Sequence, residues 1–311
     1  MCTAINNNGF FGRTLDLEYS YREAVTIAPR GFEFGFRKAA PLARHYAIIG
    51  MATIENGYPL FYDAVNEKGL ASAGLNFPKS AAYPKAQGGA INIATFELIP
   101  YVLGKCANVD EAEALLREIN IHDESFSDSF SATPLHWIFA DREKSITLEV
   151  TKNGKNIYEN PVGVLANEPP FPAMMANLDT FSALSPNEPE KQSDSRGCGA
   201  VGLPGDWSSR SRFVRAAFVR GCSLPTENNG VSEFLRLLST VEVPRGCIRL
   251  RDGKNVITYY SSCMDLARGI YYYKTYNNPR ICAADMHREN LNGKSLISFD
   301  LKTETDIFFE N

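Results

Sequence analysis

Residues 2–17 have the sequence CTAINNNGFFGRTLDL. Two strand-like segments, Cys2–Asn6 and Gly9–Leu17, flank the turn signal Asn7-Asn8-Gly9. Asn and Gly tolerate the left-handed backbone conformations that tight hairpin turns require. We therefore predict a β-hairpin that begins at Cys2. Its second strand returns beside the first and brings residues 12–16 close to Cys2.

Beyond this hairpin, strand-rich and helix-rich regions alternate along the chain. Alternating or continuous apolar patterns predict strands at Tyr46–Ile54, Pro59–Ala64, Leu70–Phe77, Leu135–Ala140, Ser145–Val150, Lys155–Tyr158, Val256–Ser261, Gly269–Thr275, Arg280–Ala284 and Leu296–Leu301. Helical spacing of apolar residues predicts helices at Ile93–Cys106, Val109–Ile119, Phe171–Phe181, Ser211–Arg220 and Val231–Thr240. The segment Ser185–Asp206 is rich in Ser, Gly, Pro and charge, which is typical of a long surface loop. This order predicts a single α+β domain over residues 1–311, with two sheets packed between helix layers.

The composition narrows the class of partner. The 36 acidic residues outnumber the 32 Lys and Arg, for a net charge of −4, and no run of five basic residues occurs. Nucleic acid and anionic membranes are therefore excluded as main partners. No apolar stretch approaches the 18 residues of a membrane-spanning helix, and the first residues carry no basic, apolar export signal.

These features predict a cytoplasmic protein in which the seven cysteines stay as free thiols. The four histidines lie far apart in the sequence and no CxxC spacing occurs, so we expect no metal and no other cofactor.

Cys2 is the strongest candidate for a nucleophile. Met1 is normally removed when the second residue is as small as Cys, and its removal leaves Cys2 with a free α-amine. A thiol and an α-amine both titrate close to the pH at which enzymes work. The amine can accept the proton of the thiol, so that no histidine is needed. Alternatively, Cys2 is a small apolar residue that begins a strand.

Charged and amide side chains elsewhere fit the same chemistry. Near Cys2, the carboxylate of Asp16 can hold the α-ammonium group and Arg13 can favour the thiolate, unless the two form a solvated ion pair. Asn76 and Asn167 each stand at the end of an apolar segment. An Asn in this position either forms a turn or donates hydrogen bonds to an oxyanion. Arg212 lies at the start of a predicted helix, where a positive charge is unfavourable because it opposes the helix dipole. Its side chain therefore either has a role outside the helix or forms a surface ion pair with Asp206.

Seven stretches of the chain form a set of motifs: MCT at 1–3, FFGRTLDLEYSY at 10–21, NEKGLASAGLNFP at 66–78, LHWIFAD at 135–141, GVLANEPPF at 163–171, GLPGDWSSRSRFVRAAF at 202–218 and SSCMDLARGIYYYKTY at 261–276. Together they resemble the choloylglycine hydrolase family of N-terminal-nucleophile amidohydrolases, which includes bile salt hydrolases and penicillin V acylases. They run nearly end to end, in the order and at the spacing of the family.

The resemblance implies a four-layer αββα sandwich with two mainly antiparallel sheets, and Cys2 as the nucleophile after removal of Met1. The catalytic residues that it implies are Cys2, Arg13, Asp16, Asn76, Asn167 and Arg212. In this scheme Asn167 and the backbone N–H of Asn76 form the oxyanion hole, and Arg212 orders the surroundings of the nucleophile.

The substrate implied by the resemblance is a glycine- or taurine-conjugated bile salt. Penicillin V acylases typically carry Tyr where this chain has Asn76, and the stretch GIYYYKTY at 269–276 is also closer to bile salt hydrolases. A steroid needs an apolar groove, for which Leu15 and Tyr62 are candidate walls, although both also suit a plain core.

Three alternatives share the fold: a penicillin V acylase, an acyl-homoserine-lactone acylase, and a catalytically silent binder of bile salts or lipids. The family also implies a homotetramer and a source among intestinal bacteria.

Overall fold

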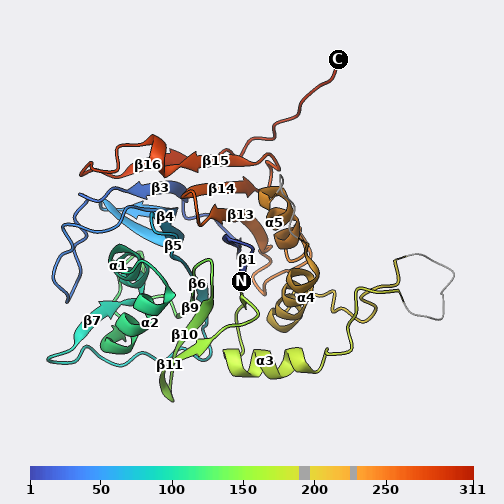
Figure 1. Cartoon of the computed structure of the whole chain (residues 1–311), viewed down its shortest axis with the longest axis horizontal. Coiled ribbons are helices and arrows are strands. Elements are labelled where there is room, and N and C mark those ends of the chain that lie inside the picture. The colour runs from blue at the N-terminus through green and yellow to red at the C-terminus, as the bar shows by residue number, and fades with distance from the viewer. Residues whose placement is uncertain (189–196, 225–229) are drawn as a thin grey trace.

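The computed structural model describes residues 1–188, 197–224 and 230–311. Its main feature is a pair of antiparallel sheets packed face to face (Figure 1). The six-stranded sheet has the order β12 (Val164–Leu165), β1 (Cys2–Asn7), β2 (Phe10–Leu17), β13 (Ile257–Asp265), β14 (Ile270–Thr275) and β15 (Cys282–Asp285). The eight-stranded sheet has the order β11 (Gly154–Glu159), β10 (Ser145–Thr151), β9 (Leu135–Ala140), β6 (Ala71–Asn76), β5 (Tyr58–Asn66), β4 (Ile48–Glu55), β3 (Ala24–Ala28) and β16 (Ile297–Asp300).

The predicted N-terminal hairpin is confirmed and lies inside the six-stranded sheet. β1 and β2 pair from Cys2 opposite Leu15 to Asn7 opposite Phe10. The turn residues Asn8 and Gly9 have φ values of 49° and 80°, the left-handed conformation that their side chains tolerate. β12 covers the other edge of β1, and β13 covers the other edge of β2. The first residues of the chain are therefore held on both sides.

Helices cover the outer face of each sheet. α1 (Leu98–Lys105) and α2 (Val109–Glu118) pack on the eight-stranded sheet, whereas α4 (Ser209–Cys222) and α5 (Gly230–Ser239) pack on the six-stranded sheet (Figure 1). α3 (Phe171–Asp179) packs against α4. The layers follow one another as helix, sheet, sheet and helix, which is the αββα arrangement expected above.

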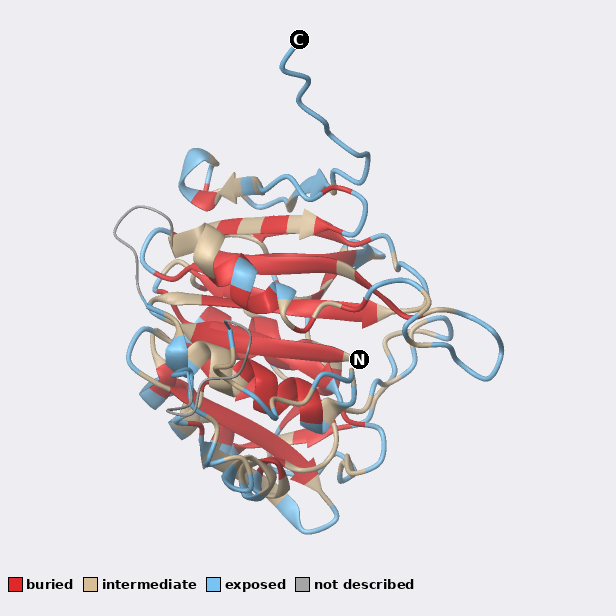
Figure 2. Ribbon diagram, turned by 90° about the vertical axis from the view of Figure 1, so that its right-hand side faces the viewer, coloured by how far each residue is buried: buried red, intermediate tan, exposed pale blue. Residues whose placement is uncertain are grey.

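Apolar side chains fill the spaces between these layers. One cluster lies between the two sheets and reaches α4 and α5; it includes Leu15, Leu75 and Phe213. A second cluster, with Trp137 and Val102 among its members, joins the eight-stranded sheet to α1 and α2. Figure 2 shows buried residues concentrated in the strands, whereas the C-terminal tail is exposed. Within the described ranges, no helix has the length and apolar character needed to cross a membrane.

The prediction of one helix over Ile93–Cys106 is wrong in its first part. Strand β7 (Ile91–Ala94) and the short 3-10 helix η1 (Thr95–Glu97) precede α1. β7 pairs in parallel with β8 (Ile119–His122), a partner that the chain reaches only after α2. A second short 3-10 helix, η2 (Met286–Arg288), follows β15.

Two further strands, β3 and β12, have no counterpart among the predicted elements. Of the predicted surface loop at Ser185–Asp206, residues 189–196 lie outside the part of the chain that the structure describes.

Candidate active site

Strand pairing directs the side chains of Cys2, Arg13 and Leu15 toward the eight-stranded sheet. Cys2 lies directly opposite Leu15, and directly opposed residues point to the same face. Arg13 is two residues before Leu15 on the same strand and therefore shares that face. Its Nη1 donates to the carbonyl oxygens of Tyr62 in β5, at 3.0 Å, and Gly74 in β6, at 2.7 Å. Arg13 thus bridges the two sheets beside the thiol.

Arg13 supplies a buried positive charge to the thiol. Its side chain has no exposed surface, and its Nη2 has no hydrogen-bond partner among the described residues. Burial lowers the pKa of Arg13, but the negative charges that Cys2, Tyr260 and Asp63 can carry raise it by more. The pKa of Arg13 is therefore raised overall. A permanent cation next to a thiol favours the thiolate.

Asp63 fixes the position of Arg13, and sequence reasoning missed it. Its carboxylate lies 3.9 Å from Arg13 Nε. The hydroxyl groups of Tyr260 and Tyr271 donate to its two oxygens at 2.7 and 2.6 Å. Burial raises the pKa of Asp63, and Arg13 and the two hydroxyl groups act against this shift. The two tyrosines come from the six-stranded sheet, so this cluster also ties the sheets together.

Asp16 lies on the opposite face of β2, toward the helices. Thr258 donates to its Oδ1 at 2.6 Å, and Thr14 donates to its Oδ2 at 3.3 Å. Burial raises the pKa of Asp16, whereas Arg212 and the N-terminal ammonium group act in the other direction. The backbone N–H of Asp16 donates to the carbonyl oxygen of Met1 at 2.9 Å. Asp16 therefore stands next to the start of the chain.

Arg212 connects Cys2 to Asn167. Its Nη1 donates to the carbonyl oxygen of Cys2 and to Thr3 Oγ1, both at 2.5 Å. Its Nη2 donates to Asn167 Oδ1 at 2.7 Å, and its Nε donates to the carbonyl oxygen of Trp207 at 3.0 Å. Burial lowers the pKa of Arg212, while Asp16 and Cys2 raise it. One side chain thus fixes both segments that meet at the thiol.

Two of the alternative interpretations from the sequence are wrong. Arg13 and Asp16 have no exposed surface, so they do not form a solvated ion pair. Arg212 is also fully buried, and the Asp206 carboxylate instead accepts hydrogen bonds from the Ser208 backbone and the Ser211 hydroxyl group. Buried charges of this kind persist only when they are partnered.

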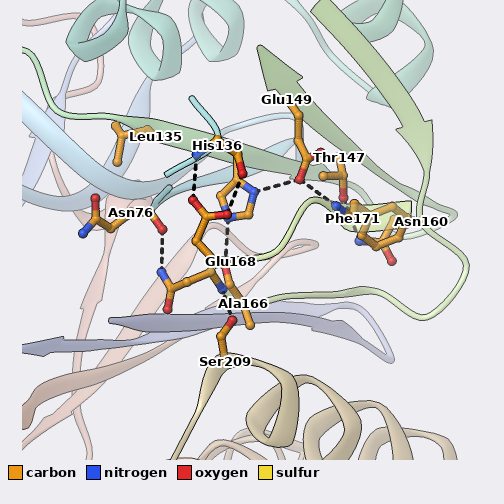
Figure 3. A network of polar contacts seen from close by, with 12 residues as sticks. Asn76, Leu135, His136, Thr147, Glu149, Asn160, Ala166, Glu168, Phe171 and Ser209 are labelled. Carbon is orange, nitrogen blue, oxygen red and sulfur yellow. Dashed lines mark hydrogen bonds and ion pairs between the residues drawn. The ribbon is translucent and has the colours of Figure 1, made fainter. Parts of the chain in front are cut away.

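Asn167 has a side-chain amide that is oriented by its partners. Its Oδ1 accepts from the backbone nitrogen of Cys2, at 2.9 Å, and from Arg212. Its Nδ2 donates to the carbonyl oxygen of Asn76 at 2.8 Å (Figure 3). Because two donors claim the oxygen, the amide cannot flip without losing both bonds. The second Nδ2 hydrogen is then available for an oxyanion. These partners lie far away in the sequence, so Asn167 does not serve a local turn.

Asn76 contributes to the site through its backbone. It is the last residue of β6, and its side chain is exposed. The same β6 carries Gly74, whose carbonyl oxygen accepts from Arg13. The structure therefore brings all six predicted catalytic residues to one place, where the β1–β2 hairpin, β6, the segment after β12 and the start of α4 meet.

The two predicted substrate-contact residues belong to, or pack against, the apolar cluster that contains Cys2. Leu15 is buried and belongs to the cluster between the sheets. Tyr62 is partly buried against that cluster, and its hydroxyl group lies 2.8 Å from Thr53 Oγ1. Burial raises the pKa of Tyr62. Both side chains therefore pack in or against the core, as the alternative interpretation expects. Contact of either one with a substrate stays a prediction.

The arrangement has the groups that amide hydrolysis requires: a thiol, a nearby cation, a backbone nitrogen that becomes an amine on loss of Met1, and oriented amide donors. In residues 1–188, 197–224 and 230–311, no group of three or more His, Cys, Asp or Glu side chains is placed to hold a metal ion.

Comparison with known proteins places this chain in a family. Residues 2–299 match the family of linear amide C–N hydrolases known as the choloylglycine hydrolase family. The chain belongs to the choloylglycine hydrolase family, as its sequence motifs predict. The fold is accordingly the αββα sandwich of N-terminal-nucleophile hydrolases.

Individual relatives are similar over their full length. A bile salt hydrolase/transferase from Lactiplantibacillus plantarum is 45% identical, with 100% of both chains covered. The solved structure of a conjugated bile acid hydrolase from Clostridium perfringens is 37% identical, with a TM-score of 0.92 and 100% of both chains covered. A penicillin V acylase from Agrobacterium tumefaciens shares the fold at 22% identity, with a TM-score of 0.78 and coverage of 97% of this chain and 92% of that one.

Proposed function

We propose that this chain is a bile salt hydrolase, which cleaves the amide bond of glycine- or taurine-conjugated bile salts. The products are the free bile acid and the amino acid. One observation carries the proposal: the buried contacts of Arg212 and Asn167 around Cys2 occur in a chain that is 45% identical over its full length to a bile salt hydrolase/transferase.

The proposed mechanism begins with removal of Met1, which turns the backbone nitrogen of Cys2 into an α-amine. That nitrogen lies 2.9 Å from Asn167 Oδ1, and Asp16 holds the start of the chain close by. The amine takes the proton of the thiol. Arg13 favours the resulting thiolate, and Arg212 keeps the first two residues in place through the Cys2 carbonyl oxygen.

Acylation follows when the thiolate sulfur attacks the carbonyl carbon of the substrate amide. The tetrahedral oxyanion accepts hydrogen bonds from Asn167 Nδ2 and the backbone N–H of Asn76. The α-ammonium group gives its proton to the leaving nitrogen, the C–N bond breaks, and glycine or taurine departs. A thioester to Cys2 remains.

Deacylation uses the same groups with water in place of the thiol. The free α-amine removes a proton from water, which attacks the thioester carbonyl carbon under the same oxyanion donors. The C–S bond breaks, and the bile acid leaves. Leu15 and Tyr62 line the apolar path of the steroid in this proposal, so that their truncation raises KM more than it lowers kcat.

The proposal is tested by incubating the protein with glycocholate, taurocholate and penicillin V side by side, after N-terminal sequencing has found Cys2 as the first residue. We expect fast release of glycine or taurine and little release from penicillin V. Release from penicillin V alone would overturn the substrate while leaving the mechanism. No release from any of the three would favour a silent binder or another acyl amide.

Three finer features belong to this proposal. We infer a homotetramer, a cytoplasmic location and one catalytic domain over the whole chain, as the family resemblance and the sequence predict. Light scattering during size-exclusion chromatography measures the first, and a monomer would contradict it.

A further inference from the structure

A buried histidine contacts both segments that present the oxyanion donors. His136, in β9, lies 2.8 Å through its Nε2 from the carbonyl oxygen of Ala166, the residue before Asn167. Its ring stacks on Phe77, the residue after Asn76, with centroids 4.2 Å apart and planes 7° apart. Figure 3 shows His136 with Ala166 and Glu149 at opposite edges of its ring. None of the steps proposed above uses it.

Glu149, in β10, holds the other edge of this ring. Its Oε1 lies 3.1 Å from His136 Nδ1, and both side chains have no exposed surface. The same oxygen accepts the backbone N–H of Phe171, the first residue of α3, at 2.9 Å. Its Oε2 has no partner among the described residues. Glu149 therefore fixes the chain four residues beyond Asn167, while His136 fixes it one residue before.

The partners determine where the protons are. A carbonyl oxygen can only accept, so His136 Nε2 carries a hydrogen toward Ala166. A backbone N–H can only donate, so Glu149 Oε1 accepts from Phe171. The contact between His136 Nδ1 and Glu149 Oε1 is a hydrogen bond only if one of these two atoms carries a proton. The ring is thus held at both edges and on one face, and a rotation of the ring breaks at least one of these bonds.

We infer that the His136–Glu149 pair is the positioning unit of the oxyanion hole. The pair sets the spacing between Asn76 and Asn167 through their neighbours Phe77 and Ala166, and it does not touch the substrate. A buried polar pair is costly to desolvate. An apolar pair can fill the same space, but it cannot orient the Ala166 carbonyl group. The inference rests on the proposed function, because an oxyanion hole is needed only for acyl chemistry.

The test compares two reactions of the same thiol. Acylation of Cys2 needs oxyanion donors, whereas alkylation by iodoacetamide is a displacement at a saturated carbon and does not. For His136→Phe we expect kcat on glycocholate to fall by about 10- to 100-fold, the size of effect that a 1 Å misplacement produces. KM and the rate of alkylation should stay within about twofold of the unmodified protein, on the same reasoning. His136→Gln keeps a donor toward Ala166 and should recover part of kcat.

His45 provides a matched control. It is also buried, it contacts the carbonyl oxygens of Tyr46 and Phe32 at 2.6 and 2.7 Å, and its ring lies 4.7 Å from that of Phe34. His45→Phe therefore removes two similar polar contacts, and we expect kcat to change far less than in His136→Phe. Equal losses of kcat in the two variants would overturn the inference.

Glu149→Gln is a milder second variant that keeps the side-chain volume. The amide oxygen can still accept from Phe171, but it carries no proton for His136 Nδ1 and no negative charge to stabilise a proton on that nitrogen. We expect kcat to fall in the same direction as in His136→Phe, again with normal alkylation. A fall of acylation and alkylation together in both variants would overturn the inference, because it would place the pair in support of the thiol itself.

A second substrate separates this inference from the proposed function. p-Nitrophenyl acetate acylates a thiolate directly: the C–S bond forms, the ester C–O bond breaks and p-nitrophenolate leaves, with Cys2→Ala as the blank. If the unmodified protein cleaves no bile salt, the proposed function fails, and the rate of this acylation still measures the oxyanion hole. Acylation by the ester that is as fast in His136→Phe as in His45→Phe would then overturn the inference.

Discussion

Asn167→Asp tests the oxyanion hole with a change of almost no volume. The substitution keeps an oxygen where Oδ1 accepts from the Cys2 nitrogen, at 2.9 Å, and from Arg212 Nη2, at 2.7 Å. It replaces the donor that lies 2.8 Å from the carbonyl oxygen of Asn76 by a second oxygen. The contact with Asn76 turns from attraction to repulsion, and the oxyanion loses its side-chain donor.

The expected effect on catalysis is large. Loss of one oxyanion donor lowers kcat by about 10²- to 10³-fold, or about 2.7–4 kcal/mol. The added negative charge stands close to the developing oxyanion and acts in the same direction. We therefore expect kcat on glycocholate to fall at least about 10²-fold, with KM nearly unchanged. The lost hydrogen bond to Asn76 costs about 1–3 kcal/mol of unfolding free energy, offset in part by closer charge pairing with Arg212.

The assay is release of glycine from glycocholate, with iodoacetamide alkylation of Cys2 as a measure of the intact nucleophile. Asn66→Asp is the matched control: Asn66 is fully buried and its Nδ2 donates to the carbonyl oxygens of Leu103 and Cys106, both at 2.7 Å. It should lose stability but keep kcat. A kcat for Asn167→Asp within about threefold of that of Asn66→Asp would refute the role of the Asn167 side chain, since a lost oxyanion donor costs far more.

Three further predictions concern the residues around the thiol. Cys2→Ala should abolish glycine release and keep a cooperative thermal unfolding transition; retained turnover would end the proposed mechanism. Arg212→Lys keeps a positive charge near Asp16 but cannot reach Cys2, Thr3 and Asn167 together, so that kcat should fall by about 10-fold or more and unfolding free energy by about 3 kcal/mol in urea titrations. Unchanged values of both would contradict this assignment. Burial raises the pKa of Asp63 in the folded protein. Above about pH 4 the folded state therefore keeps a proton that the unfolded state has already released. As a result, the unfolding free energy falls as the pH rises through the raised pKa of Asp63. In Asp63→Asn this decrease of the unfolding free energy with pH should be missing. Urea midpoints of the unmodified protein and of Asp63→Asn that change in parallel from pH 4 to 7 would argue against the prediction.

Local patterns predicted most elements because their signals are complete within a few residues. The hairpin turn at Asn8-Gly9 is one case, and the helix after Asn108 is another, since the Asn108 side chain accepts from the Glu111 backbone as an N-cap does. The error at Ile93–Cys106 has the opposite cause. Residues 91–94 are extended because they pair with Ile119–His122, and that partner is not visible in the local pattern.

The contacts within the site also fall into two groups: those that a local sequence pattern predicts, and those that depend on distant strands. Asp63, His136 and Glu149 each interrupt an apolar strand, and a polar residue in such a position must find a partner. For His136 and Glu149 the partner follows from the sequence, because the predicted strands Leu135–Ala140 and Ser145–Val150 form a hairpin. The register that pairs Trp137 with Leu148 brings the next residues, His136 and Glu149, opposite each other.

Asp63 has no such local solution. Its partners Tyr260 and Tyr271 come from the other sheet, 197 and 208 residues away. The contact exists only because β13 and β14 extend the sheet that begins with the N-terminal hairpin, and because that sheet packs over β5. The groups that we propose to act on the substrate were predicted from family motifs. The groups that hold them, by contrast, follow from how the two sheets meet, and they are therefore the residues whose replacement tests the fold and the chemistry together.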